Sequence, residues 1–112
     1  MNEEVKNYIE KYSDEIRFLF DELRTLVINS VSREINETLW ARLPSYYVED
    51  RFIRIIPFKD HINIEAKAIL QYRSELKEFK ITPKGMLQIY PNKSIPKDIL
   101  QAIFKETLLE CI

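Results

Sequence analysis

Acidic side chains gather at the start of this 112-residue chain, where residues 1–23 carry seven Asp and Glu against three Lys and Arg. Carboxylate oxygens bind hard cations and ferrous iron, so Asp14, Glu15, Asp21 and Glu22 are candidate ligands for a weakly bound iron ion. Neighbouring residues on a helix point about 100° apart, and each pair therefore forms an open patch instead of a closed site. The same carboxylates equally suit a solvated helix face that binds no metal.

His61 is the only histidine, and histidine is the side chain that changes its charge most readily near neutral pH. It follows a predicted turn at Lys59–Asp60 and shares a strand face with Asn63 and Glu65. These features suit a metal ligand or a proton carrier, and they equally suit a hydrogen-bonded structural residue. Zinc is not expected, because His61 has no second histidine or nearby cysteine to complete a site.

A third group of residues is the candidate ligand or partner surface, which we expect on the solvent-facing side of a β-sheet. Its members are Trp40, Tyr46, Arg54, His61 and Gln88. An aromatic side chain with a few convergent polar groups is what a small-molecule pocket or a partner patch requires. Trp40 separates two interpretations, because a partner-binding surface predicts that it is exposed and a core role predicts that it is buried.

Signatures of catalysis are absent from the sequence, which contains no Gly-rich phosphate loop, nucleophile elbow or Cys–His pair with an orienting residue. Ser45 is a conceivable nucleophile, but no base can be identified for it. We therefore expect a protein that is not an enzyme. The remaining catalytic alternative would use His61 as a general base.

The segment 51–65 is predicted to form the centre of the sheet, as two strands joined at Lys59–Asp60. β-Branched residues dominate it, and Ile62 and Ile64 alternate with polar residues, as in a strand with one buried and one wet face. Pro57 lacks a backbone donor, so its strand must lie at an edge there or contain a bulge. Further strands are predicted at residues 34–40, 45–48 and 86–90.

Apolar residues at helical spacing predict four helices. The predicted helices cover residues 5–12, 14–31, 67–80 and 96–112. Ser13 suits the N-cap of the second helix, and Pro96 suits the first turn of the last one. Gly85 is the only glycine, which indicates a turn that needs a positive φ or a close backbone approach.

This order of elements predicts an α+β fold, in which N-terminal, middle and C-terminal helices pack on one face of an antiparallel sheet. Every apolar stripe is then buried, and the opposite face of the sheet is wet or covered by another molecule. The length fits one domain over residues 1–112.

Composition narrows the classes of partner. The net charge of −1 and the scattered Lys and Arg disfavour nucleic acid. No signal sequence and no membrane-spanning run is apparent, so we expect a cytoplasmic protein with no membrane partner. Cys111 is the only cysteine, which excludes an internal disulfide, and its place on an apolar helical stripe indicates a packing role.

Three segments of the second half carry a family pattern. Phe58 to Ile62 reads Phe-Lys-x-His-Ile, Thr82 to Pro91 contains Lys-Gly-x-x-Gln-x-x-Pro, and Ile95 to Leu100 follows. Together they resemble the YdhG-like family of bacterial proteins, a domain of unknown function, over nearly the whole chain. The resemblance implies an α/β sandwich similar to the frataxins, and some members look like intracellular iron chaperones.

The chain departs from this family at two places. It has Ala41-Arg42-Leu43-Pro44 where the family usually has Tyr-Gly-Met-Pro, and Asn63 to Ala66 where the family has Gly-x-Tyr-Pro. The first hypothesis is thus a cytoplasmic binding protein that carries iron to a recipient protein. The alternative is a metal-free domain that binds a small molecule or a protein through the sheet face around Trp40 and His61.

Overall fold

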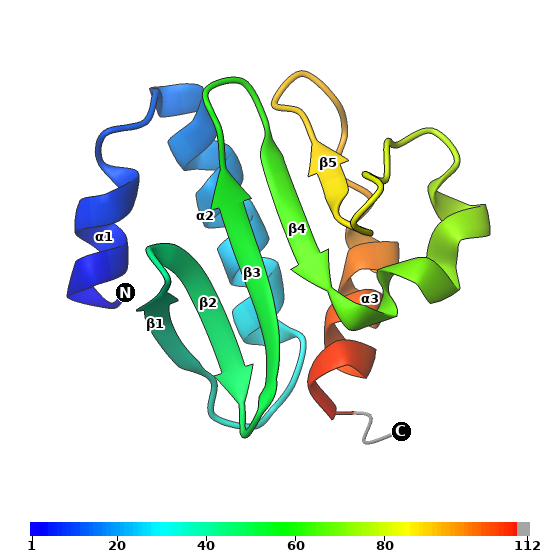
Figure 1. The fold of residues 1–112 in the computed structure, drawn as a ribbon, viewed down its shortest axis with the longest axis horizontal. Coiled ribbons are helices and arrows are strands. Elements are labelled where there is room, and N and C mark those ends of the chain that lie inside the picture. The colour runs from blue at the N-terminus through cyan, green and yellow to red at the C-terminus, as the bar shows by residue number, and fades with distance from the viewer. Residues whose placement is uncertain (110–112) are drawn as a thin grey trace.

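The computed structural model describes residues 1–109, and its five strands form one antiparallel sheet in the order β1-β2-β3-β4-β5 (Figure 1). Each strand pairs with its neighbour in the sequence. The elements are α1 (Glu3–Ile9), α2 (Asp14–Asn29), β1 (Asn36–Trp40), β2 (Leu43–Val48), β3 (Arg51–Pro57), β4 (Ile62–Ala66), η1 (Lys67–Leu76), β5 (Leu87–Ile89) and α3 (Lys97–Leu109). The predicted packing of Cys111 lies outside the described residues.

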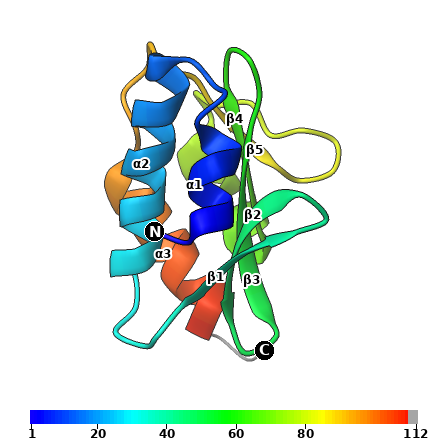
Figure 2. The same ribbon diagram turned by 90° about the vertical axis from the view of Figure 1, so that its left-hand side faces the viewer.

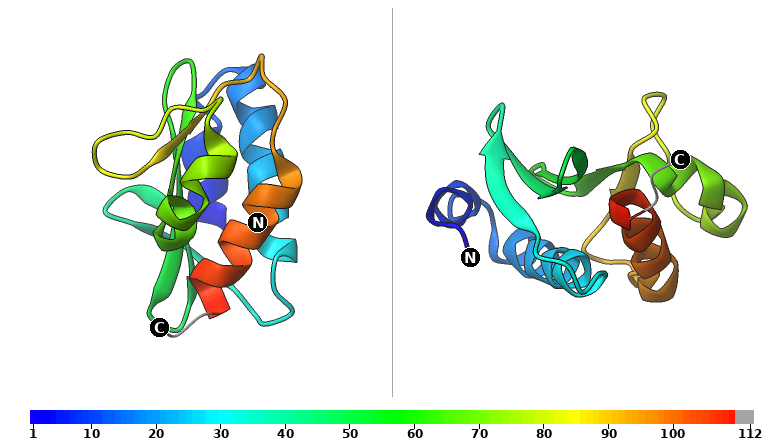
Figure 3. Two further views of the ribbon diagram at one scale, coloured as in Figure 1. Left: turned by 90° about the vertical axis from the view of Figure 1, so that its right-hand side faces the viewer. Right: turned by 90° about the horizontal axis from the view of Figure 1, so that it is seen from below.

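The helices α1, α2 and α3 cover one face of the sheet (Figures 2 and 3). The Ser13 hydroxyl begins α2 as predicted, since its oxygen accepts a hydrogen bond from the Ile16 amide at 3.3 Å. Between the layers lie fully buried side chains such as Phe20 of α2, Ile53 of β3 and Phe104 of α3. The predicted α+β architecture, an antiparallel sheet with helices on one face, is confirmed.

The opposite side of the sheet, called the open face below, is formed by side chains that alternate with core residues along each strand. Its residues include Trp40, Ser45, Phe52, Arg54, Asn63, Glu65 and Gln88. Pro57 is the last residue of β3 and pairs with Ile62 of β4, beyond the point where β2 stops pairing with β3. Its missing donor is therefore tolerated at a local edge, one of the two predicted solutions.

The predicted helix over residues 67–80 is wrong in type and length. The structure has a 3₁₀-helix, η1, which ends at Leu76 and is interrupted at Tyr72 by non-helical dihedral angles. Two contacts with α3 hold it in place: the Ala68 amide donates to the Thr107 hydroxyl at 3.1 Å, and the Tyr72 hydroxyl donates to the Glu106 carboxylate. Runs of 3₁₀-helix longer than a few residues are uncommon, and the break at Tyr72 divides η1 into two short pieces.

Both outer edges of the sheet carry further contacts. At β1, the Asn2 side-chain amide donates to the Glu37 carbonyl at 3.1 Å, and α1 lies along that strand (Figure 2). At β5, the Gln88 amide donates to the Lys80 carbonyl at 2.9 Å, and Ile81 forms a bridge with Leu87. Exposed strand edges invite pairing with other chains. These contacts leave fewer backbone donors and acceptors free at either edge.

The β1–β2 hairpin turns through Ala41 and Arg42, which both have positive φ angles of 50° and 65°. Two-residue turns of this kind favour Asn-Gly, because side chains other than Asn and Gly are strained there. Gly85, in contrast, has the predicted positive φ, 87°. The hairpin thus contains a local strain that a substitution can remove.

We expect the double substitution Ala41→Asn with Arg42→Gly to raise the free energy of unfolding by about 1 kcal/mol. Urea denaturation at neutral pH measures this change. The control Arg42→Ala removes the side chain but keeps a strained L-residue, and it should give no such gain. Equal stability of all three proteins would show that the turn is not strained.

Candidate functional site

Arg54 lies at the centre of the open face, and only 7% of its side chain is exposed. Its guanidinium donates to one carboxylate oxygen of Glu65 at 3.0 Å, and its Nε donates to the Ser45 hydroxyl at 3.2 Å. The Tyr47 hydroxyl lies 3.4 Å from another guanidinium nitrogen. A buried cation requires such partners. The neighbouring strands β2 and β4 supply all three of them.

Two aromatic rings contact the same guanidinium. Its central carbon lies 4.1 Å from the ring centre of Trp40 and 3.9 Å from that of Phe52. Both distances are typical of cation–π contacts. Trp40 is nevertheless 53% exposed. Of the two interpretations of Trp40, the structure favours exposure, in the form of a large aromatic surface held in place by a buried charge.

His61 belongs to a second aromatic group at the β3–β4 turn. Its ring stacks on Phe58, with ring centres 4.8 Å apart and planes inclined by 9°, and it also contacts Tyr90 at 5.2 Å. Its Nδ1 lies 2.7 Å from the Asp60 carboxylate, and this hydrogen bond lowers the pKa of Asp60. These contacts give His61 a well-defined orientation and support the structural reading of this residue.

Two amide side chains lie between the aromatic groups, on paired positions of β4 and β5. The Gln88 side-chain oxygen accepts a hydrogen bond from the Tyr90 hydroxyl at 3.3 Å. The Oδ1 atom of Asn63 is buried and has no hydrogen-bond partner among residues 1–109. Such an atom costs about 1–3 kcal/mol. A donor group that reaches this part of the open face would recover that energy.

Tyr46 does not belong to the open face, and its predicted place there is wrong. The alternation along β2 turns Ser45 and Tyr47 outward and directs Tyr46 into the core, where it is fully buried. Its hydroxyl donates to the Glu37 carboxylate at 2.8 Å. The remaining predicted members of the surface fall into two groups, with Trp40 and Arg54 in contact and His61 near Gln88 through Tyr90.

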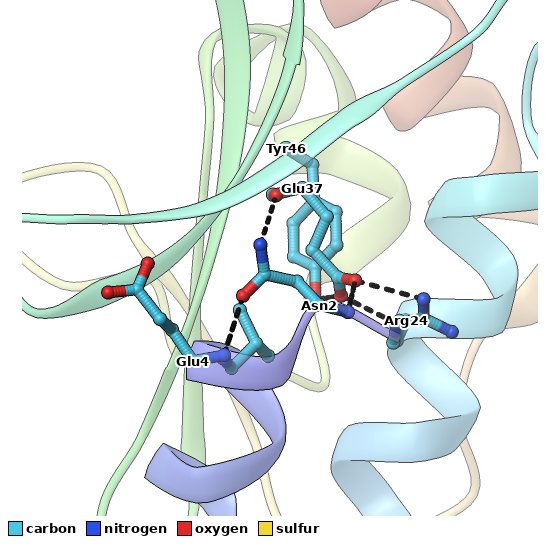
Figure 4. Close-up of polar contacts among 6 residues, drawn as sticks. Asn2, Glu4, Arg24, Glu37 and Tyr46 are labelled. Carbon is cyan, nitrogen blue, oxygen red and sulfur yellow. Dashed lines mark hydrogen bonds and ion pairs between the residues drawn. The ribbon is translucent and has the colours of Figure 1, made fainter.

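Glu37 is the centre of a buried polar network that the sequence patterns did not indicate (Figure 4). Only 8% of its side chain is exposed. Two nitrogens of Arg24 donate to its carboxylate at 2.6 and 3.0 Å, and the backbone amide of Asn2 donates to the same carboxylate at 2.7 Å. The Asn2 side-chain oxygen in turn caps α1 by accepting from the Glu4 and Val5 amides. The network therefore joins α1, α2, β1 and β2.

Hydrogen bonding decides the ionisation of this network. Burial by itself would raise the pKa of Glu37, but the donors from Arg24, Asn2 and Tyr46 outweigh burial and lower it. Burial and the adjacent Glu37 charge raise the pKa of Tyr46. The carboxylate is thus ionised and the phenol neutral at physiological pH. The geometry suits a structural junction, since the protein itself supplies hydrogen-bond donors to both oxygens of the carboxylate.

The four predicted iron ligands do not converge. Asp14 and Asp21 line the groove between α1 and α2 together with Arg17, which forms an ion pair with Asp14. Glu15 and Glu22 line a different groove, beside Lys93 and Lys97. Within residues 1–109, no group of three or more His, Cys, Asp or Glu side chains is placed to hold a metal ion together.

No family model, curated protein or solved structure matches this chain. The resemblance to the YdhG-like family therefore stays a prediction that rests on the sequence patterns. None of the helices within the described part of the chain combines the length and the hydrophobicity that crossing a bilayer requires.

Proposed function

We propose that this protein is a binding domain whose open face receives a partner protein. The observation that carries the proposal is Trp40, which is more than half exposed and yet fixed against the buried guanidinium of Arg54. Tryptophan and arginine are enriched among the residues that dominate the energy of protein interfaces. A ring that is already held in place loses little conformational entropy when a partner covers it.

The sheet edges favour recognition through side chains. Asn2 and α1 lie at β1, and residues 80 and 81 lie at β5, so an incoming strand would have to displace existing contacts. The open face has no such cover from the three helices, which all lie on the other side (Figure 3). We therefore propose that the partner is read by Trp40 and its neighbours and not by strand addition.

The test uses Trp40 as the only tryptophan in the chain. The immobilised protein serves as bait for a cell extract, in parallel with Trp40→Ala and with Phe18→Ala. Phe18 is 70% exposed on α2, away from the open face, and is a matched control for the loss of an exposed aromatic ring. A partner of the open face should bind the wild type and Phe18→Ala, and lose about 30-fold or more in affinity for Trp40→Ala.

The captured protein must then be purified and added to bait labelled with 5-fluorotryptophan. We expect its binding to shift the single fluorine resonance. A partner that leaves this resonance unchanged, or that binds Trp40→Ala as tightly as the wild type, would contradict the proposal.

Iron delivery, the function that the family resemblance implies, stays a prediction with less support. The two pairs of carboxylates lie in separate grooves, and each groove also contains basic side chains. Anaerobic titration of the protein with ferrous iron, followed through amide resonances of α2, tests it: saturable shifts at Asp14, Glu15, Asp21 and Glu22 would support a carrier. The cytoplasmic location expected from the sequence belongs to the same proposal.

A further inference from the structure

A groove at the β5 side of the sheet separates η1 from the segment that follows it. Its apolar part includes Leu70, Phe79 and Ile81, and its charged part consists of Arg73, Lys77 and Lys84. Leu70 is 50% exposed and adds apolar surface to the groove. Figure 1 shows η1 and this segment together at the β5 side of the sheet. The groove therefore combines exposed apolar surface with three positive charges.

The three basic side chains form no ion pair within residues 1–109. No acidic residue lines the groove with them, although the whole chain has a net charge of −1. Elsewhere on the molecule, Arg17, Arg24, Arg33 and Arg54 each have a carboxylate partner. The groove is thus a local positive region on a slightly acidic protein, and its charge is available to a ligand.

Both walls of the groove are fixed in the free protein. Residues 82–86 form a turn in which the Gly85 amide donates to the Thr82 carbonyl at 2.8 Å, and the Thr82 amide donates to the Met86 carbonyl at 2.8 Å. On the other wall, η1 is attached to α3 through Ala68 and Tyr72. A Cβ atom at Gly85 would lie 3.9 Å from Leu70, so the two walls approach each other at this point. Little ordering is needed for a ligand to bind.

We propose that this groove binds an acidic, amphipathic peptide segment of a partner protein. Carboxylates of the peptide would face Arg73, Lys77 and Lys84, and its Leu, Ile or Phe side chains would cover Leu70 and Phe79. Complementary charge selects the partner and its orientation, while apolar contact supplies affinity. Neither Trp40 nor Arg54 lines this groove.

Selection from a random peptide phage library against the intact protein tests the proposal. We expect the selected peptides to be enriched in Asp and Glu next to Leu, Ile and Phe. A synthetic copy of the most enriched peptide should lose about tenfold or more in affinity when Lys77→Glu and Lys84→Glu are combined. The control Lys6→Glu with Lys105→Glu changes the net charge equally at exposed positions outside the groove and should bind as the wild type does.

Two NMR signals distinguish binding in the groove from binding at the open face. Gly85 is the only glycine and Trp40 the only tryptophan, so the Gly85 amide and the Trp40 indole give readily assigned NMR signals. The peptide should shift Gly85 and leave Trp40 unchanged. Peptides without acidic residues, equal binding to the groove variant, or shifts at Trp40 alone would overturn the proposal.

Anionic membranes are the competing ligand for a basic groove with an exposed Leu. Vesicles of phosphatidylserine and phosphatidylcholine in a ratio of about 1:3 test them in a flotation assay, because such lipid surfaces attract exposed Lys and Arg. If these vesicles retain the wild type but not the variant Lys77→Glu with Lys84→Glu, and the library yields no groove-dependent peptide, the groove belongs to a membrane surface and the peptide proposal is wrong.

Discussion

The substitution Glu37→Ala should lower the free energy of unfolding by about 3 kcal/mol or more, because it leaves the Arg24 guanidinium and the Tyr46 hydroxyl without their shared acceptor. Removing one partner of a buried ion pair is far more damaging than removing an exposed one. Domains of this size are stable by only about 5–15 kcal/mol. Urea denaturation at pH 7 measures the loss, and Glu10→Gln, at an exposed position, serves as the control.

The lowered pKa of Glu37 also determines how stability should change with pH. The pKa of Glu37 in the folded protein lies below its ordinary value of 4.5. The stability that it contributes is therefore fully present above about pH 4.5 and is lost as the pH falls through the lower, folded-state pKa. Unfolding curves of the wild type and Glu37→Gln should converge in free energy across this acidic range. A constant difference from pH 7 to pH 3 would show that ionisation of Glu37 does not stabilise the fold.

The second large effect is expected for Arg54→Ala, which should cost about 2–3 kcal/mol of stability and free Trp40 from its support. The guanidinium contributes charged hydrogen bonds to Glu65 and Ser45, and its contacts with Trp40 and Phe52 are largely shielded from water. The fluorescence of Trp40 reports the second consequence directly. We expect lower anisotropy and emission at longer wavelength than in the wild type.

Arg54→Lys separates charge from shape. Lysine keeps the positive charge near Glu65 but cannot present a planar group to two rings and two oxygen acceptors. This variant should retain part of the stability and still show a more mobile Trp40. Arg42→Ala, at an exposed position of the β1–β2 turn, should leave the anisotropy unchanged. If Arg54→Ala also left it unchanged, the buried guanidinium would not be what positions the ring.

Local patterns predicted most of the fold, because they depend on residues close together in the chain. The hairpin 51–65, the Ser13 cap and the positive φ of Gly85 follow from β-branched alternation, a short polar side chain and the absence of a Cβ atom. Tyr46 was assigned to the wrong face because residues 45–47 offer no clear alternation, and a shift of one residue reverses the side on which a side chain lies.

The candidate site depended more on tertiary structure. The partners of Glu37 lie 13 and 35 residues away, at Arg24 and Asn2, and no spacing rule joins them. The sequence groups Asp14 with Glu15 and Asp21 with Glu22 as open patches. The structure instead places Asp14 with Asp21 and Glu15 with Glu22 in two grooves, which depend on the segments that flank the helix. The sequence likewise does not decide whether Trp40 is exposed, since its ring could close the core or face water.

The strictly sequential order of the strands has a consequence for how the chain reaches this structure. The first three strand pairs, β1–β2, β2–β3 and β3–β4, each close a short turn, so little chain entropy opposes the growth of the sheet from one hairpin to the next. The β4–β5 pair instead closes across residues 67–86. The last helix, α3, returns to β3 from furthest along the chain: Arg51 donates to the Leu108 carbonyl across 57 residues. Local pairing can therefore form β1 to β4 early, whereas the part of the apolar side that α3 covers stays unprotected until this last helix docks.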